Sequence, residues 1–212
     1  VSCLVQGFKK LDSRGYDSAG LAVVQADHIE RVRSVGRVAE LEKASANTDS
    51  RTGIAHTRWA THGIPSERNA HPHVSGSIAV VHNGIIENYE SLRQQLTTEG
   101  YVFTSDTDTE TIAHLVDLTL RREPDLFRAV QIACRQLVGA YAIAVIDHRQ
   151  PGRIVVSHEG SPLLLGLSDN GNYAASDASA LLQVTRNMVY LENGDIAELT
   201  ASGVRIETLA GE

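Results

Sequence analysis

The sequence has 212 residues, of which 42% are hydrophobic, 21% charged and 5% aromatic, a composition typical of one large globular domain. Its 19 basic and 26 acidic residues give a formal net charge of −7, which argues against a nucleic-acid-binding surface. No apolar run approaches the roughly 20 residues of a membrane-spanning helix, so we expect one soluble domain over residues 1–212 with no membrane partner.

The predicted elements begin with an amphipathic helix over 1–11, because its apolar residues fall on one arc of a helical wheel. Strands are predicted over 19–24, 29–35, 53–57 and 78–82. Three helices follow: one begins near Tyr89 and ends at Gly100, one begins at a Thr107-x-x-Glu110 capping box, and one follows Pro124.

Six further strands are predicted over 141–147, 154–158, 163–167, 188–191, 195–199 and 204–209. Asn193-Gly194 predicts a two-residue hairpin between two of them. Repeated hairpins, with helices grouped in succession, favour a layered α+β fold over a parallel doubly wound sheet. We therefore expect two packed sheets with helices outside.

Two cysteines, Cys3 and Cys134, are too few for a disulfide scaffold, and the sequence shows no secretion signal. The composition thus favours a cytoplasmic protein. Cys3 lies within the predicted first helix, and we interpret it as a structural residue rather than a nucleophile.

Polar and glycine residues of the kind that line functional sites are concentrated in four segments. These are 14–18, 56–63, 82–88 and 105–110. Three of the four follow a predicted strand or precede a predicted helix, where a rigid scaffold presents reactive groups. They are the candidate site segments.

Arg58 and Asp108 carry opposite charges that suit the two ends of an amino acid. The guanidinium of Arg58 matches a carboxylate, although a solvated surface arginine is the alternative. Asp108 could bind an ammonium group, or it could only complement the N-terminus of its predicted helix. Together they would recognise an α-amino acid zwitterion.

Asn83-Gly84 follows an apolar strand and has two interpretations. It is either a simple turn or a pair of donors, the Asn amide and the Gly N–H, that converge on a developing oxyanion. The nine histidines raise the question of zinc, but the spacings of His71 with His73 and of His56 with His62 match no usual ligand pattern. We predict no metal and no organic cofactor.

Taken together, the four segments resemble the class II glutamine amidotransferases, and among them the glutaminase domain of the glucosamine-6-phosphate synthase family. Further stretches of the same kind are 69–73, 112–115, 160–163, 175–177 and 192–195, so the resemblance covers nearly the whole chain. It implies an N-terminal-nucleophile hydrolase fold, a four-layer α/β/β/α sandwich. The implied reaction is hydrolysis of L-glutamine to glutamate and ammonia, which the intact enzyme uses to convert fructose 6-phosphate to glucosamine 6-phosphate.

The resemblance also implies roles for individual residues. Asn83 and Gly84 would form the oxyanion hole. The substrate-binding residues would be Arg58 with Thr61 and His62 at the α-carboxylate, Asp108 with Gly84 at the α-ammonium, and Trp59 in a loop that closes over glutamine. Arg14 would support the strand that carries the nucleophile.

In this family the chain begins with a cysteine whose thiol attacks the amide and whose α-amino group is the base. The present sequence begins at Val1, so we expect that the segment with this cysteine lies upstream or has been lost. In the second case the chain would bind glutamine without hydrolysing it. A related amidotransferase is a further alternative, against which the loop over 57–63 argues. The intact enzyme is expected to add C-terminal sugar-phosphate isomerase domains and to form a homodimer.

Overall fold

The computed structural model describes residues 4, 7, 17–35, 41, 50–59 and 63–212. Most of the helix predicted over 1–11 lies outside the described residues. So do Cys3 and three of the predicted site residues, Arg14, Thr61 and His62.

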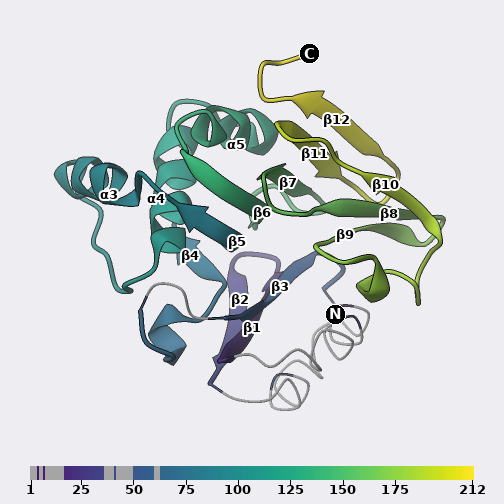
Figure 1. Cartoon of the computed structure of the whole chain (residues 1–212), viewed down its shortest axis with the longest axis horizontal. Helices are drawn as coiled ribbons and strands as arrows, with labels where there is room; N and C mark the ends of the chain where they lie inside the picture. The colour runs from purple at the N-terminus through teal and green to yellow at the C-terminus, as the bar shows by residue number, and fades with distance from the viewer. Residues whose placement is uncertain (1–3, 5–6, 8–16, 36–40, 42–49, 60–62) are drawn as a thin grey trace.

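A six-stranded antiparallel sheet forms the centre of the molecule, with the strand order β12-β11-β7-β6-β5-β4 (Figure 1). Its strands are β4 (His73–Ser75), β5 (Ile78–Ile86), β6 (Gly139–Asp147), β7 (Ile154–Glu159), β11 (Asp195–Leu199) and β12 (Val204–Thr208). Successive side chains in β5 alternate between two hydrophobic clusters, so that Ile78 and Val80 face one layer while Ala79 and Val81 face the other. The sheet is therefore buried on both faces.

Three helices cover one of these faces: α3 (Tyr89–Thr98), α4 (Asp108–Leu120) and α5 (Leu126–Cys134) (Figure 1). α4 packs on β4 and β5, α5 packs on β7 and β11, and α3 packs on α4. Cys134 is a buried free cysteine in this helical layer, and burial raises the pKa of its thiol to about 12. Cys134 is thus a core residue and not an activated nucleophile. No helix in the described part of the chain is both long and apolar enough to span a bilayer.

Two three-stranded antiparallel sheets cover the other face. One has the order β2-β1-β3, formed by β1 (Ser18–Val24), β2 (Ile29–Ser34) and β3 (Gly53–Arg58). The other has the order β10-β8-β9, formed by β8 (Leu164–Ser168), β9 (Gly171–Ala175) and β10 (Asn187–Tyr190). Short 3₁₀ helices span Glu67–Asn69 and Ala178–Ala180. The predicted α+β sandwich is confirmed, but the second layer consists of two sheets rather than one.

Three local predictions differ from the structure. Asn193-Gly194 is a turn but not a hairpin, because β10 and β11 belong to different sheets. β4 and β9 were not predicted. The capping box is half formed. The Thr107 hydroxyl accepts a hydrogen bond from the Glu110 N–H, but the Thr107 N–H donates to Ser105 Oγ. The Glu110 carboxylate accepts instead from the N–H groups of Thr104 and Ser105.

Candidate active site

The ends of β3 and β5 and the first turn of α4 enclose a cavity of about 220 Å³. Its lining residues come from four segments that the chain separates widely: His56, Thr57, Arg58, Trp59, His71, His82, Asn83, Gly84, Thr107, Asp108 and Thr109. The structure therefore brings together five of the predicted site residues, Arg58, Trp59, Asn83, Gly84 and Asp108. It leaves Arg14, Thr61 and His62 outside the described residues.

Arg58 is the last residue of β3 and is only 3% exposed, so the interpretation as a solvated surface residue is wrong. One guanidinium nitrogen, Nη2, donates to the carbonyl of Gly63 at 3.2 Å. Burial lowers the pKa of Arg58, while the negative charges of Asp17 and Asp108 raise it. The guanidinium stays charged because no protein environment brings its pKa near neutrality.

Asp108 is the first residue of α4 and is 4% exposed. Its Oδ2 accepts a hydrogen bond from the Ile86 N–H at 2.8 Å, and its Oδ1 lies 3.9 Å from Nδ1 of His82. This carboxylate thus does more than complement a helix N-terminus, because it ties α4 to β5. Asp108 and Arg58 line the same cavity, and the negative charge of Asp108 raises the pKa of Arg58.

Glu110 fixes the first turn of α4 to the segment that precedes the helix. Its carboxylate accepts hydrogen bonds from the N–H groups of Thr104 at 2.8 Å and Ser105 at 2.7 Å. Burial alone would raise the pKa of Glu110, but the nearby His114 imidazole, with Nε2 3.6 Å from Oε1, and hydrogen bonds from Ser105 and Thr104 outweigh burial and hold the pKa well below its ordinary value. The turn that presents Asp108 is therefore fixed before any ligand binds.

Asn83 and Gly84 lie within β5, opposite Ala142 and Tyr141 of β6, so the interpretation as a simple turn is wrong. Gly84 has a φ of 119°, a conformation that residues with a side chain avoid. A Cβ at this position would lie 2.0 Å from the carbonyl oxygen of Ala140. Glycine is required here because the neighbouring strand leaves no room for any side chain.

The hydrogen-bond alternation of β5 indicates where its N–H groups point. The Glu87 N–H bonds to Val138 on the β6 side, whereas the His82 N–H bonds to His71 and the Ile86 N–H bonds to Asp108 on the opposite side. Gly84 lies midway between His82 and Ile86, and alternate residues of a strand direct their N–H groups to the same side. Its N–H therefore faces the cavity side of the strand rather than β6.

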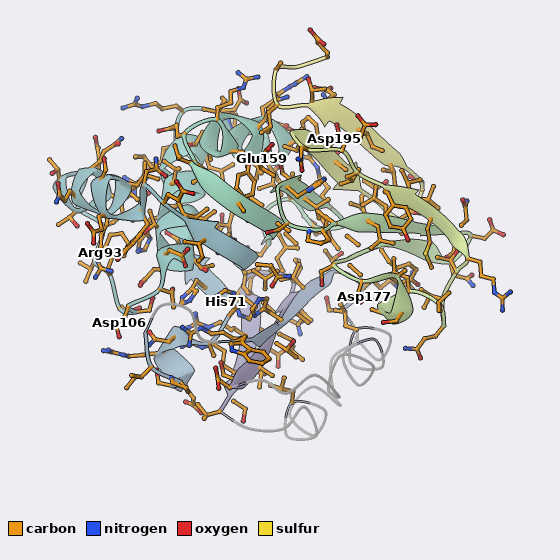
Figure 2. All side chains as sticks on the ribbon, viewed as in Figure 1. His71, Arg93, Asp106, Glu159, Asp177 and Asp195 are labelled. Carbon is orange, nitrogen blue, oxygen red and sulfur yellow. The ribbon has the colours of Figure 1, made fainter. Side chains whose placement is uncertain are left out.

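The histidines of the cavity were not assigned from the sequence. His71 stacks on His56 with ring centroids 4.1 Å apart, and it lies where the β1–β3 sheet meets the six-stranded sheet (Figure 2). Its Nδ1 accepts from the His82 N–H at 3.4 Å, so its proton is on Nε2, which lies 3.1 Å from Thr109 Oγ1. Burial lowers the pKa of both His56 and His71. The rings are neutral and form the polar floor of the cavity.

Two features could have signalled this cluster. Gly20 of β1 lets the backbone of His71 approach closely, since a Cβ there would lie 1.9 Å from the His71 carbonyl oxygen. The histidines also occur in three segments that already attracted attention. Sequence spacing alone could not predict this cluster, because its contacts join residues far apart in the chain.

Trp59, at the rim of the cavity, is 71% exposed.

Comparison with known families agrees with this geometry. The profile described as "Glutamine amidotransferase domain" matches residues 56–183, more than half of the chain and the span that holds every cavity residue. The chain therefore belongs to this family of glutamine amidotransferase domains.

The relatives point to one branch of the family. The chain is 55% identical over 212 residues to the glutamine–fructose-6-phosphate aminotransferase (isomerizing) of Vibrio cholerae, covering 99% of this chain and 35% of the relative. The same enzyme of Pseudomonas putida is 55% identical over 210 residues, covering 97% of this chain and 34% of the relative. The chain thus spans about a third of the length of these curated relatives.

Among solved structures, the glutamine phosphoribosylpyrophosphate amidotransferase from B. subtilis superposes with a TM-score of 0.81 at 25% identity. The match covers 98% of this chain and 46% of that chain. The matched part of this amidotransferase therefore has the fold of the present chain.

Proposed function

We propose that this chain is a glutaminase domain that hydrolyses L-glutamine to glutamate and ammonia. In the intact enzyme, the ammonia would convert fructose 6-phosphate to glucosamine 6-phosphate. The proposed domain comprises residues 1–212 and needs neither a metal nor an organic cofactor. Its relatives are larger enzymes, and we propose that sugar-phosphate isomerase domains complete the protein, as a homodimer in the cytoplasm.

One observation carries the proposal: a buried cation and a buried anion, Arg58 and Asp108, line the same cavity as two oxyanion-type donors. A free amino acid carries one carboxylate and one ammonium group, and both would be desolvated on entry. Charge-assisted hydrogen bonds compensate that cost where the partners are already fixed. The Arg58 guanidinium would bind the α-carboxylate, and the Asp108 carboxylate would bind the α-ammonium.

The side-chain amide of the bound glutamine would then lie near Asn83 and Gly84. Attack of a thiolate on the amide carbon forms a carbon–sulfur bond and moves an electron pair onto the oxygen. The Asn83 side-chain N–H and the Gly84 N–H would stabilise this oxyanion. Collapse breaks the carbon–nitrogen bond, the nitrogen leaves as ammonia after taking a proton, and a glutamyl thioester remains. Water then hydrolyses the thioester to glutamate and regenerates the thiol.

The remaining roles rest on the resemblance. The thiol would belong to an N-terminal cysteine, which is neither Cys3 nor Cys134. Arg14 would support its strand, Trp59 would close over the substrate, and Thr61 and His62 would assist Arg58 at the carboxylate.

Ammonia release from L-glutamine by the full-length natural protein tests the proposal. Replacing Asn83 with alanine should lower kcat by about 10² to 10³ and leave KM nearly unchanged, because an oxyanion donor acts in the transition state. Asn187→Ala is the matched control, since Asn187 is also an exposed strand residue but lies on β10, away from the cavity. Glutamine binding without ammonia release would instead indicate a binding module.

A further inference from the structure

The amide of Asn83 can serve an oxyanion in only one of its two orientations. Its NH₂ end donates hydrogen bonds, whereas its carbonyl end only accepts them and would repel a developing negative charge. Rotation by half a turn exchanges the two ends at almost no cost in shape. A donor to the oxyanion therefore needs a partner that fixes the amide.

His56 is that partner. Its Nε2 lies 2.7 Å from Oδ1 of Asn83, and the ring is 9% exposed at the end of β3. If the ring proton is on Nε2, the imidazole donates to Oδ1 and turns the NH₂ end of Asn83 the other way. If the proton is on Nδ1, the opposite amide orientation is favoured.

The other ring nitrogen decides between these two tautomers. Nδ1 of His56 is buried and has no hydrogen-bond partner among the described residues. A buried N–H without an acceptor is rarer in proteins, and costlier, than an acceptor without a donor. The proton is therefore on Nε2, which agrees with the orientation of Asn83 in the structure.

Two further features hold the ring in this state. The stack on His71, with an interplanar angle of 23°, restricts rotation of the His56 ring. Burial lowers the pKa of His56 to about 4, so at neutral pH the ring carries one proton and no charge. The backbone of His82 raises the pKa of the ring, but burial outweighs this effect, so the second proton is not bound at neutral pH.

We propose that His56 is a positioning residue for glutamine hydrolysis, which orients the Asn83 amide so that its NH₂ end faces the oxyanion. This inference rests on the proposed function, in which Asn83 is an oxyanion donor. His56 does not touch the reacting atoms, so its effect should pass entirely through Asn83.

The first test compares two substitutions in the full-length natural protein. His56→Leu removes the donor, and His56→Gln keeps an N–H that can reach Oδ1. His56→Leu should lower kcat for glutamine hydrolysis about 10-fold or more with KM changed less than about threefold. His56→Gln should recover most of that loss. Equal losses in both variants would contradict the inference.

The second test is a double-mutant cycle with Asn83→Ala. If His56 acts through Asn83, then His56→Leu should change kcat less than about twofold once Asn83 is alanine. The same fold-loss in both backgrounds would overturn the inference and leave the role of Asn83 intact. If Asn83→Ala alone has no effect on kcat, the proposed function of Asn83 fails, and this inference fails with it.

His158→Leu is the matched control for a buried histidine. His158 of β7 is 5% exposed, its Nδ1 donates to the Ser161 carbonyl at 2.8 Å, and it does not line the cavity. This variant should lower thermal stability but leave the kcat of the folded protein within about twofold. A His56→Leu variant that behaved like His158→Leu would show that His56 has only a packing role.

Discussion

The two three-stranded sheets occupy equivalent places on one face of the central sheet and differ in what they contribute. β10-β8-β9 packs through an apolar cluster that includes Leu163, Leu165 and Leu199, and none of its described residues lines the cavity. β2-β1-β3 also packs through small apolar residues, but β3 ends in His56, Thr57 and Arg58, which line the cavity. The layer needs both sheets for its core, whereas the candidate site uses the end of one strand.

This difference shows that a layered fold can hold a polar site at the end of one strand while apolar packing elsewhere maintains its stability. Ser18 of β1 and His56 and Arg58 of β3 are buried polar residues, and the last two line the cavity. Substitutions in the two sheets should therefore separate stability from function. Four predictions test that separation, two of them in these sheets and two in the first turn of α4.

The largest effect is expected in the apolar sheet. Leu165 of β8 is fully buried, so Leu165→Ala should lower the free energy of unfolding by about 2 to 5 kcal/mol through lost burial and the cavity left behind. Urea denaturation measures the loss, and glutamine turnover per folded molecule should not change. Leu182, 59% exposed, provides the control, since Leu182→Ala should have little effect. A drop in turnover with Leu165→Ala would mean that the two sheets are not functionally separate.

In the other sheet, Arg58→Met should weaken binding of L-glutamate, the proposed product, by about 30-fold, or roughly 2 kcal/mol, through loss of a charge-assisted contact. Isothermal titration calorimetry measures the affinity. Arg33→Met is the control, because Arg33 of β2 also donates to backbone carbonyls, those of Arg68 and Ala70, but does not line the cavity. Similar affinities for the two variants would remove Arg58 from the binding site.

Across the cavity, Asp108→Asn keeps an oxygen for the Ile86 N–H and removes the charge. L-glutamate affinity should fall about 10-fold, roughly 1.4 kcal/mol, while the loss in stability stays below about 1 kcal/mol. Asp125→Asn is the control, because Asp125 also lies at a helix N-terminus and accepts a backbone hydrogen bond, from the Arg128 N–H, but does not line the cavity. If only stability falls, Asp108 has no role beyond its helix.

The smallest effect depends on pH. The pKa of Glu110 is lowered in the folded protein, so its contribution to stability is present above the unfolded-state pKa of about 4.3 and is lost as pH falls. Between pH 7 and pH 4 this loss should be about 0.6 kcal/mol, and Glu110→Gln should lack it. Unfolding at the two pH values measures both slopes. The deficit of Leu165→Ala should stay the same at both, because its cluster is apolar.

Local signals in the sequence were sufficient for most elements. Gly100 ends α3 as expected, with a φ of 93° and a Tyr101 N–H that bonds back to the Leu96 carbonyl. The alternating and continuous apolar runs located ten of the strands within one or two residues, except that β5 extends further, to Ile86. These signals depend only on residues close together in the sequence, so the sequence alone was sufficient to predict them.

Long-range features could not be predicted in this way. The turn at Asn193-Gly194 has the same local chemistry whether it joins paired strands or links two sheets. β4 has three residues, too few for a periodic pattern. Arg58, Asn83 and Asp108 were expected in the site, yet only the packing of both α4 and β3 against β5 brings them to one cavity. The contact of His56 with Asn83 joins two strands from different sheets and has no local signature.

β5 also has a consequence for which amino acids could react. The proposed oxyanion donors, Asn83 and Gly84, and the Ile86 N–H that anchors Asp108 belong to one strand held in register by β6. Strand geometry, about 3.3 Å per residue, therefore sets the span between the two ends of the substrate. An amide with one methylene fewer falls short by about one carbon–carbon bond, about 1.5 Å. The fixed spacing along the backbone of β5 would thus favour glutamine over asparagine by the length of the side chain alone.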